Sequence, residues 1–353
     1  MDLSSVVDPL LKWYRVNARI LPWREDHSPY RVWLSEIMLQ QTRVEAVIPY
    51  FNRFLTALPS IRALAEAEEE QLLKLWEGLG YYTRVRNLQK AAQLILKEYN
   101  GEFPRDHAAI RSLPGIGEYT AGAIASIAFG QPVPAVDGNV LRVLSRLLES
   151  REDIRKPGVK TEFTEALRQI YPSEHCGDFT QALMELGATV CLPNGDPKCG
   201  ECPLAFLCRA FRNGSFREIP VKTGKKPRRV EQRTILLIHC NGEFALKRRP
   251  SRGLLAGMME FPGLDGVCTL SGIRRYLESS GIHAGTIRKG IRSKHIFSHV
   301  EWHMVSYELE TTDRSTGFEW IPLAEIRERV SLPTAFQPFA SRLEELYRDR
   351  FAQ

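Results

Sequence analysis

The stretch Leu113-Pro-Gly-Ile-Gly-Glu-Tyr-Thr-Ala121, followed by Ala135-Val-Asp-Gly-Asn-Val140, decides the fold of the first half of this chain. It predicts a short helix, a tight turn and a second helix, because the proline ends the first helix. Gly115 and Gly117 allow backbone geometry that a β-carbon would forbid. Small and apolar residues then continue to Phe129, as in a packed helix. Backbone N–H groups at the start of that helix could lie directly against a phosphate.

Asp137 stands directly before the periodic apolar run Val140–Leu148, in the place of a helix N-cap residue. The positive end of the helix dipole and the first free N–H groups favour the ionised form of a carboxyl group there. We therefore expect Asp137 to be held in its charged form.

Glu36 lies in a helical pattern that begins at Ser28-Pro29 and continues at three-to-four spacing to Phe51. A glutamate in a helix is ordinarily a solvated surface residue, and that interpretation stays open. The neighbours Ile37 and Leu39 instead favour burial, which raises the pKa of a carboxyl group. Two carboxyl groups, one favoured in its protonated form and one in its ionised form, are typical of a general acid and its electrostatic partner.

The chain has 353 residues and a net charge of +6, which gives room for two or three domains. So small a charge attracts a polyanion only through local basic clusters. No apolar run approaches the length of a membrane span, and the first residues lack a basic leader with an apolar signal core. We expect no membrane partner and a cytoplasmic, bacterial protein that is nucleoid-associated when engaged.

Seven cysteines fit a reducing compartment if some of them are ligands. Four are separated by seven, two and five residues: Cys191, Cys199, Cys202 and Cys208. Four thiolates at such spacing could hold a [4Fe–4S] cluster or a tetrahedral zinc ion, and the spacing does not choose between them. The other three, Cys176, Cys240 and Cys268, are predicted to be small buried side chains.

The sequence changes character after residue 215. Residues 216–231 are rich in Arg, Lys, Pro and Gly and predict an extended basic linker, either solvated or in contact with phosphates. Beyond it, Thr234–Cys240, the turn Asn241-Gly242 and Phe244–Arg249 predict a β-hairpin, and Trp302–Leu309 predicts a further strand. Helices are expected at Leu270–Ser279 and Leu323–Arg329. An α+β domain therefore follows an all-α region.

The Leu-Pro-Gly-Ile-Gly hairpin, the downstream aspartate and the cysteine cluster together resemble the helix-hairpin-helix DNA glycosylases of the endonuclease III superfamily. The resemblance implies an all-α catalytic region over residues 1–215. The helix-hairpin-helix barrel would span about 26–130, and the cluster-bearing helices would come from residues 1–25 and 131–215.

This resemblance also implies a [4Fe–4S] cluster on the four cysteines. Its role would be structural, presenting Lys198 and Arg209 to the DNA backbone. The family usually has six residues in the first gap between cysteines, whereas this chain has seven. The contacts of that loop therefore stay open.

Superfamily members that also cleave the DNA strand resemble one another in a lysine three residues after the position of Ile116, whose amine forms a Schiff base with the sugar. Here that position is Tyr119. A phenol cannot form an imine, so the resemblance implies a monofunctional glycosylase with at most weak strand nicking.

Nearly the whole chain resembles the MutY family of adenine DNA glycosylases. Besides the hairpin and the cysteine loop, the matching stretches are Pro22-Trp-Arg24, Leu34-Ser-Glu-Ile-Met-Leu-Gln-Gln-Thr42, Gly78-Leu-Gly-Tyr-Tyr82, Val136-Asp-Gly-Asn139, Leu254–Gly263 and His295-Ile-Phe-Ser-His299. The resemblance implies base excision repair by a monomer. It would flip adenine paired with 8-oxoguanine or guanine out of double-stranded DNA and remove it.

Four catalytic residues follow from this resemblance. Glu36 would protonate N7 of the flipped adenine, and Asp137 would stabilise, or covalently trap, the oxocarbenium ion. Tyr119 and Asn139 would support Asp137 and the departing base.

The same comparison implies residues that bind the substrate. Arg24 and Gln181 would line the adenine pocket, although ordinary hydrogen bonds at a helix surface would also explain them. Gln41 and Tyr81 would wedge into the stack that the flipped base leaves. A tyrosine packed inside a capped helix end is an equal alternative for Tyr81.

Residues 232–353 resemble a Nudix domain through the stretch that ends at Gly263. Nudix hydrolases bind magnesium with an Arg-Glu…Glu-Glu helix, and the corresponding helix Leu270–Ser280 lacks paired carboxylates, so metal chemistry is not expected there. The implied role is recognition of the 8-oxoguanine strand. Phe297, Ser298 and His299 would lie at the damaged base, and a plain strand end is the alternative.

Three rival functions fit the sequence less well. A bifunctional pyrimidine glycosylase/lyase is opposed by Tyr119 and by the second domain. A non-catalytic DNA-binding scaffold is opposed by the presence of both Glu36 and Asp137, and a Nudix hydrolase by the missing acidic helix.

Overall fold

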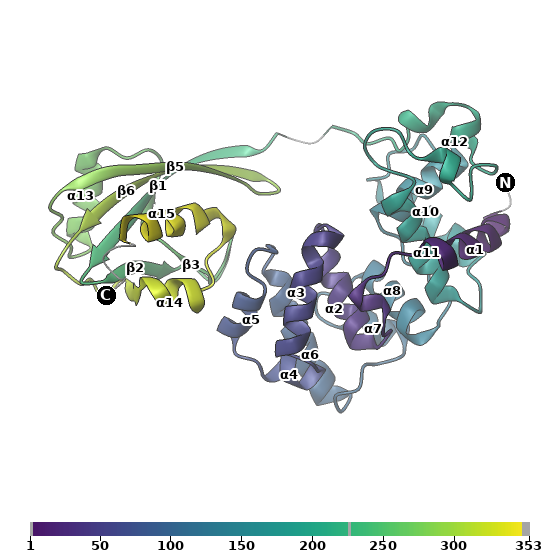
Figure 1. Ribbon diagram of the computed structural model, residues 1–353, viewed down its shortest axis with the longest axis horizontal. Helices are drawn as coiled ribbons and strands as arrows, with labels where there is room; N and C mark the ends of the chain where they lie inside the picture. The colour runs from purple at the N-terminus through teal and green to yellow at the C-terminus, as the bar shows by residue number, and fades with distance from the viewer. Residues whose placement is uncertain (1–2, 225–226, 348–353) are drawn as a thin grey trace. The chain divides into compact units, whose positions relative to one another are not determined.

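A computed structural model describes residues 3–224 and 227–347. The chain forms two compact units, Met1–Ala67 with Arg86–Gly224, and Glu68–Val85 with Lys225–Gln353 (Figure 1). Lys225 and Lys226 of the predicted linker, and residues 348–353 of the predicted C-terminal domain, lie outside the described residues.

The first unit is helical, as predicted. Its helices are α1 (Val7–Asn17), α2 (Pro29–Leu39), α3 (Val44–Ala57), α4 (Ile61–Glu66), α6 (Thr83–Glu98, which starts in the second unit), α7 (His107–Ser112), α8 (Glu118–Phe129), α9 (Gly138–Leu148), α10 (Pro157–Arg168), α11 (Cys176–Thr189) and α12 (Arg209–Arg212). Short 3-10 helices lie at Leu3–Val6, Pro22–Arg24, Cys199–Glu201 and Ser215–Arg217.

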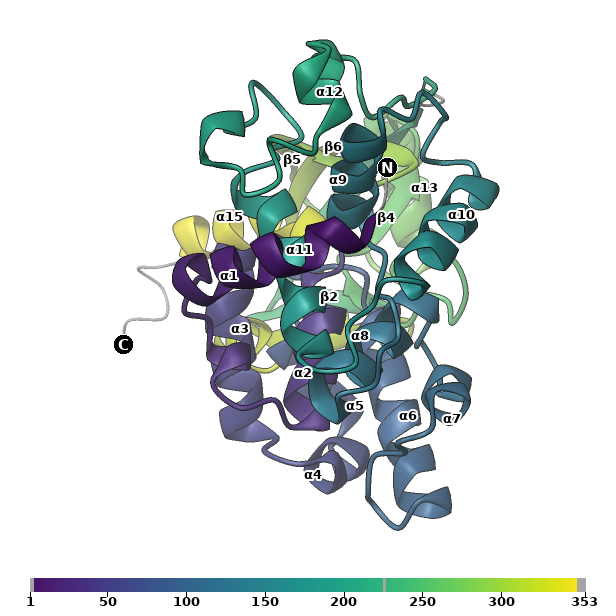
Figure 2. The ribbon, with the colours of Figure 1, turned by 90° about the vertical axis from the view of Figure 1, so that its right-hand side faces the viewer.

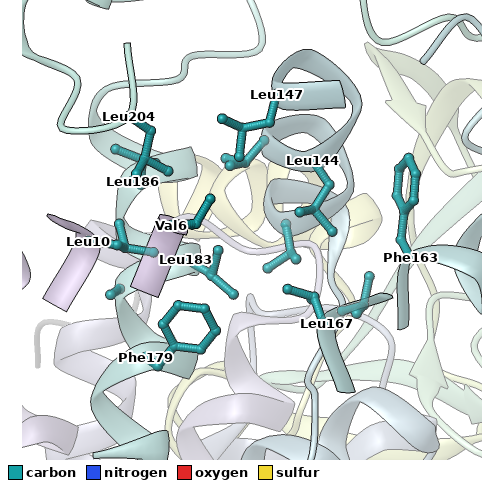
Figure 3. Packing of buried hydrophobic residues seen from close by; sticks show 14 of the residues in the cluster. Val6, Leu10, Leu144, Leu147, Phe163, Leu167, Phe179, Leu183, Leu186 and Leu204 are labelled. Atoms are coloured by element: carbon teal, nitrogen blue, oxygen red, sulfur yellow. The ribbon is translucent and has the colours of Figure 1, made fainter. Parts of the chain in front are cut away.

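One hydrophobic core joins α1, α9, α10 and α11. Leu10, Leu144, Phe163 and Leu183 are fully or almost fully buried in it (Figure 3). Helix α1 lies beside α11, as Figure 2 shows from a second side. Because this core fixes α9 and α11, it also fixes the functional side chains at the start of α9 and along α11.

The predicted single helix from Ser28-Pro29 to Phe51 is wrong, because the structure has two helices there, α2 and α3. Gln41, in the segment between them, has φ of 60°, which a right-handed helix cannot contain. The polar run Gln40–Thr42 thus marks a helix break, and α2 ends three residues after Glu36.

The hairpin between α7 and α8 has the predicted helix–turn–helix form, and its two glycines differ. Gly115 has φ of +78°, and a β-carbon there would lie 2.7 Å from the Asn87 side chain, so glycine is required. Gly117 has φ of −95°, and a β-carbon there would meet nothing within 4 Å. The prediction that its backbone geometry needs glycine is wrong; its missing side chain instead leaves the N-terminus of α8 open.

The predicted basic linker, residues 216–231, is shorter in the structure. Ile219 is buried, and its carbonyl oxygen accepts a hydrogen bond of 2.8 Å from Arg146 Nε. Val221 forms a β-bridge with Asp153, and strand β1 already begins at Arg229. The boundary predicted at residue 215 therefore falls inside the first unit, which also lacks Glu68–Val85.

The second unit consists of a sheet with helices on both faces. The elements are α5 (Glu69–Leu75), β1 (Arg229–Cys240), β2 (Glu243–Arg248), β3 (Met259–Glu260), β4 (Gly263–Asp265), α13 (Leu270–Ser279), β5 (Ile287–Ile296), β6 (Val300–Glu310), β7 (Glu319–Pro322), α14 (Leu323–Glu328), a 3-10 helix (Thr334–Phe336) and α15 (Gln337–Tyr347). The strand order is β3-β2-β1-β6-β5, with β4 on β1 and β7 on β2. Helix α13 packs on one face, and α14 and α15 pack on the other (Figure 1).

The β1–β2 hairpin is confirmed, with Cys240 paired to Glu243 across a two-residue turn. The parallel pairing of β1 with β6 was not predicted, and it makes the sheet mixed. Edge strand β5 was also missed, because its sequence Ile287-Arg-Lys-Gly-Ile-Arg-Ser-Lys-His-Ile296 is dominated by basic and polar residues rather than by alternation.

Candidate active site and recognition turn

A cavity of about 640 Å³ opens in the first unit where α2, α8, α9 and α11 meet. Its lining contains most of the predicted catalytic and substrate-binding residues: Arg24, Glu36, Gln41, Gly117, Tyr119, Asp137, Asn139 and Gln181. Segments more than 140 residues apart in sequence therefore contribute to one concave site, from Arg24 to Gln181.

Glu36 is buried on the α2 face that packs against α8, with 6% of its surface exposed. Burial, together with the negative charge of Asp137, raises the pKa of this carboxyl group to about 7. A hydrogen bond from Tyr119 and the positive charge of Arg24 act in the opposite direction. The predicted raised pKa of this carboxyl group is confirmed, and its surface interpretation is excluded.

Tyr119, in the first turn of α8, donates a hydrogen bond of 2.5 Å to Glu36 Oε2. Burial and the nearby carboxyl groups of Glu36 and Asp137 raise its pKa well above the ordinary value. Its phenol therefore stays protonated and donates to Glu36.

Asp137 caps α9 as predicted, since its Oδ1 accepts a 2.8 Å hydrogen bond from Val140 N. Its other oxygen accepts 2.7 Å from Asn139 Nδ2, and Arg142 Nη2 in turn donates 2.8 Å to Asn139 Oδ1. The pKa of Asp137 is nevertheless raised, because burial outweighs these hydrogen bonds. The hydrogen bond at the helix end lowers the pKa of Asp137, as expected, but burial acts more strongly in the opposite direction.

Arg24 lines the cavity, and hydrogen bonds fix the position of its guanidinium group. Its Nη2 donates 2.8 Å to Glu185 Oε2, and Glu185 also accepts 2.7 Å from Arg19 Nε. The side chain of Glu185 is 1% exposed, and the two arginines lower its pKa although burial alone would raise it. Glu185 was not predicted from the sequence. Its spacing of four residues from Gln181 on α11 was the signal that could have found it.

The remaining predicted contacts with the substrate lie in different places. Gln181 is buried in the cavity wall, and Gln41 lines the cavity with a left-handed backbone. Tyr81 belongs to the second unit, is 48% exposed and has φ of 49°. The Arg84 guanidinium lies 5.4 Å from the centre of the Tyr81 ring, so this tyrosine is not packed inside a helix end.

The four clustered cysteines lie on the loop after α11 and at the start of α12. Among the residues that the structure describes, no three or more Cys, His, Asp or Glu side chains form a closed metal site. Burial, together with the charges of the other three thiols, raises the pKa of Cys202 to about 12. Arg146 Nη1 lies 3.2 Å from Cys191 Sγ. Four thiols that influence one another beside a guanidinium fit, as a donor set, an anionic metal–thiolate centre.

The scattered cysteines follow the prediction in two cases of three. Cys176 and Cys240 are buried, whereas Cys268 is only partly buried.

The turn between β5 and β6 carries the three residues predicted to read the damaged base. Ser298 and His299 are exposed, with Ser298 Oγ 3.2 Å from His299 Nδ1. Phe297 is half-buried instead, its ring centre 4.8 Å from that of Trp302. The Arg233 guanidinium lies 4.2 Å from the centre of the Trp302 ring. The turn is therefore supported by the contacts of Phe297 with Trp302 and of Trp302 with Arg233.

Comparison with known proteins agrees with this architecture. Residues 34–169 match the family of HhH-GPD superfamily base excision DNA repair proteins, and residues 233–342 match the NUDIX domain family. Among solved structures, an endonuclease III–DNA complex is 27% identical, with a TM-score of 0.52 over 60% of this chain and 96% of that one. A thermostable thymine-DNA glycosylase is 26% identical, with a TM-score of 0.54 over 60% of this chain and 97% of its own.

Curated relatives extend the similarity over both units. The chain is 34% identical to the adenine DNA glycosylase of Buchnera aphidicola (subsp. Schizaphis graminum), over 84% of this chain and 85% of the relative. It is 34% identical to that of Rattus norvegicus, over 92% of this chain and 75% of the relative. The Arabidopsis thaliana protein is 40% identical over 72% of this chain, and the match spans about half (46%) of that relative's length. The chain therefore belongs to the adenine DNA glycosylase family, DNA repair enzymes that hydrolyse N-glycosyl bonds in base excision repair.

Proposed function

We propose that this protein removes adenine paired with 8-oxoguanine, or with guanine, from double-stranded DNA, without cleaving the strand. The observation that carries the proposal is the shared cavity of Glu36, Tyr119 and Asp137, in which one carboxyl group has a pKa of about 7. A cavity of about 640 Å³ has room for a flipped purine nucleotide.

The reaction follows from the two carboxyl groups. Glu36 in its protonated form donates a proton to N7 of adenine, and the bond between C1′ of the sugar and N9 of the base breaks toward the base. The carboxylate of Asp137 then faces the cationic sugar, which it stabilises or traps before water adds. Asn139, anchored by Arg142, holds the second oxygen of Asp137.

Arg24 and Gln181 are proposed to contact the base, since both line the cavity. The open N-terminus of α8 at Gly117, next to the Gly115 turn, is proposed to receive a backbone phosphate. Gln41 and Tyr81 are proposed to fill the stack that the base leaves, as exposed positive-φ turns can.

Recognition of the opposite base is proposed for Ser298 and His299, with Phe297 supporting their turn. An exposed hydroxyl and an imidazole can meet the altered N7–O8 edge of 8-oxoguanine. Replacing both residues with alanine should reduce the ratio of the adenine release rate opposite 8-oxoguanine to the rate opposite guanine. An unchanged preference would remove this element of the proposal.

A [4Fe–4S] cluster is proposed on Cys191, Cys199, Cys202 and Cys208, and when bound it would supply a rigid scaffold for DNA contact. Lys198 and Arg209 flank these cysteines, and Lys198 pairs only loosely, at 3.8 Å, with Glu201. We further propose that the protein acts as a monomer on bacterial nucleoid DNA in the cytoplasm. The described residues contain no helix long and apolar enough to span a membrane.

The test is a base-release assay on paired duplexes. Adenine should be released opposite 8-oxoguanine, and the strand should break only after hot alkali exposes the abasic site. Strand cleavage without alkali at the rate of base release would contradict the monofunctional assignment, and absence of release would contradict the function.

A further inference from the structure

Strand β5 carries a row of cations that the proposed chemistry does not use. Lys289, Arg292 and Lys294 border a groove of about 540 Å³ on the sheet face that also bears His303, Val305 and Tyr307. Val305 and Tyr307 are each 8% exposed and form its floor, while the three cations stand on the edge strand.

A β-bulge brings these three side chains together. Side chains alternate between the two faces of a regular strand, so residues 289 and 292 would lie on opposite faces. The register of β5 shifts between Lys289 and Arg292, which inserts one extra residue and returns both to the face of Lys294.

The bulge is built by two dedicated residues. The buried Ser306 hydroxyl accepts a 2.9 Å hydrogen bond from Ile291 N and lies 3.3 Å from Ile291 O, so it satisfies the backbone that the bulge leaves unpaired. A β-carbon at Gly290 would collide with Ser306 Oγ and lie 2.7 Å from Glu308 Oε1. Gly290 and Ser306 thus maintain the bulge, and with it the row of cations on one face.

The charge in the groove is only partly balanced. Lys294 pairs with Glu301 at 2.6 Å. Within residues 3–224 and 227–347, Lys289 and Arg292 form no ion pair. The groove runs along the same strand that leads into the Phe297–His299 turn, with Lys294 three residues before it.

We propose that this groove binds the phosphate backbone of the DNA strand whose base the Phe297–His299 turn contacts. Unpaired lysine and arginine side chains beside an apolar floor suit a phosphate–sugar backbone, which is anionic on one side and carbon-rich on the other. The choice of strand rests on the proposed function; the binding of phosphate does not.

The test compares two arginines of the same strand. Arg292→Ala removes a cation of the groove, and Arg288→Ala removes another exposed arginine, on the opposite sheet face, where its Cα pairs in register with that of Glu308. Equilibrium binding of the full-length variants is measured at several salt concentrations on a duplex with adenine opposite thymine. No base release is expected from this duplex, so the measurement does not depend on excision.

Arg292→Ala should reduce the slope of log K against log salt by about 0.9, and Lys289→Ala with Arg292→Ala by roughly twice as much. Arg288→Ala should keep the wild-type slope. Equal slopes for the Arg288 and Arg292 variants, or no change in either, would overturn the proposal and would leave the groove as a surface for an acidic protein. Base release from the 8-oxoguanine duplex at saturating enzyme should be the same in the wild-type protein and in these variants. If neither the wild-type protein nor any variant releases adenine, the proposed function is contradicted, and the proposal for the groove is not.

Discussion

At the scale of single residues, the charge of Glu36 depends on a balance between burial and three neighbours. Burial and Asp137 raise the pKa of this carboxyl group, while Tyr119 and Arg24 lower it, and the result lies at about 7. Each neighbour can be altered separately, and each alteration has a predicted sign.

Glu36→Gln should slow adenine release by roughly 10²- to 10⁴-fold, because an amide cannot donate the proton. In the unaltered protein, release should decline as pH rises through about 7, since only the protonated carboxyl group is an acid. Single-turnover rates on the adenine·8-oxoguanine duplex measure both effects, with duplex binding as the control. A release rate that does not change with pH across the neutral range would contradict the assignment of Glu36 as the general acid.

Tyr119→Phe should move that decline to higher pH. The lost hydrogen bond stabilises the carboxylate of Glu36, so its removal raises the pKa of Glu36 further. The matched control is Tyr30→Phe, which removes a buried hydroxyl from the same helix as Glu36. That hydroxyl donates only to Leu58 O, outside the cavity. Similar pH profiles for the two variants would show that Tyr119 does not tune the acid.

Glu185→Gln should destabilise the protein by on the order of 3 kcal/mol, because it leaves two guanidinium groups around a buried site without their counter-charge. It should also move the decline in rate to lower pH, since less of the positive charge of Arg24 is compensated near Glu36. Urea unfolding and the pH profile measure these effects.

The control for this variant is Glu45→Gln, which removes the exposed partner of Arg19 at 3.9 Å. An exposed pair contributes about 0–1 kcal/mol, so little change is expected. Equal decreases in the free energy of unfolding in the two variants would argue against a specific role for Glu185.

At the scale of elements, the hairpin between α7 and α8 separates two uses of glycine. Gly115 provides a left-handed turn against Asn87, whereas Gly117 provides open space at the N-terminus of α8. Sequence alone treats them alike, because both appear in one motif.

Gly115→Ala should destabilise the protein by roughly 1–3 kcal/mol, because it combines a positive φ with a steric clash. Gly117→Ala should change stability by less than about 0.5 kcal/mol yet weaken duplex binding, because its methyl group occupies the space proposed for a phosphate. Thermal unfolding and binding titrations distinguish the two. The reverse pattern, with Gly117→Ala unfolding and Gly115→Ala binding poorly, would contradict this division.

At the scale of the whole molecule, the proposed catalytic and recognition residues lie in different units. The cavity lies wholly in the first unit, and the Phe297–His299 turn and the β5 groove lie in the second. The cysteine loop is packed against the same core that positions α9 and α11, through Leu204 and the partly buried cysteines.

Cys202→Ser should remove bound iron and labile sulfide and weaken duplex binding. The α1–α9–α11 core should remain folded, because its apolar contacts do not depend on the thiols. Metal analysis, visible absorbance and far-ultraviolet circular dichroism measure these properties. Cys268→Ser, in the second unit, is the control and should retain full iron content. Zinc in place of iron in protein prepared without oxygen would exclude the cluster.

Much of the site was predictable from sequence because its residues stand in local patterns. The cap at Asp137 follows from the polar residue before an apolar run, whereas the choice of Tyr119 rests on the resemblance to the glycosylase family. Gly290 and Ser306 gave no such signal, since a bulge depends on two strands meeting in one register. Glu185 was missed because its partners, Arg19 and Arg24, lie about 160 residues away.

The sequence by itself determined that Glu36 and Asp137 are candidates for an acid and its electrostatic partner, where the helices α8, α9 and α13 lie, and that a β-hairpin domain follows a helical one. These features depend on neighbours along the chain, through periodicity, caps and turns. Tertiary structure alone decided the direction in which the pKa of Asp137 shifts, because burial outweighs its cap, and it decided the partner of Arg24. It also decided the face on which β5 presents its cations. Desolvation and strand register both depend on groups that are distant in sequence. A local sequence pattern therefore cannot predict them.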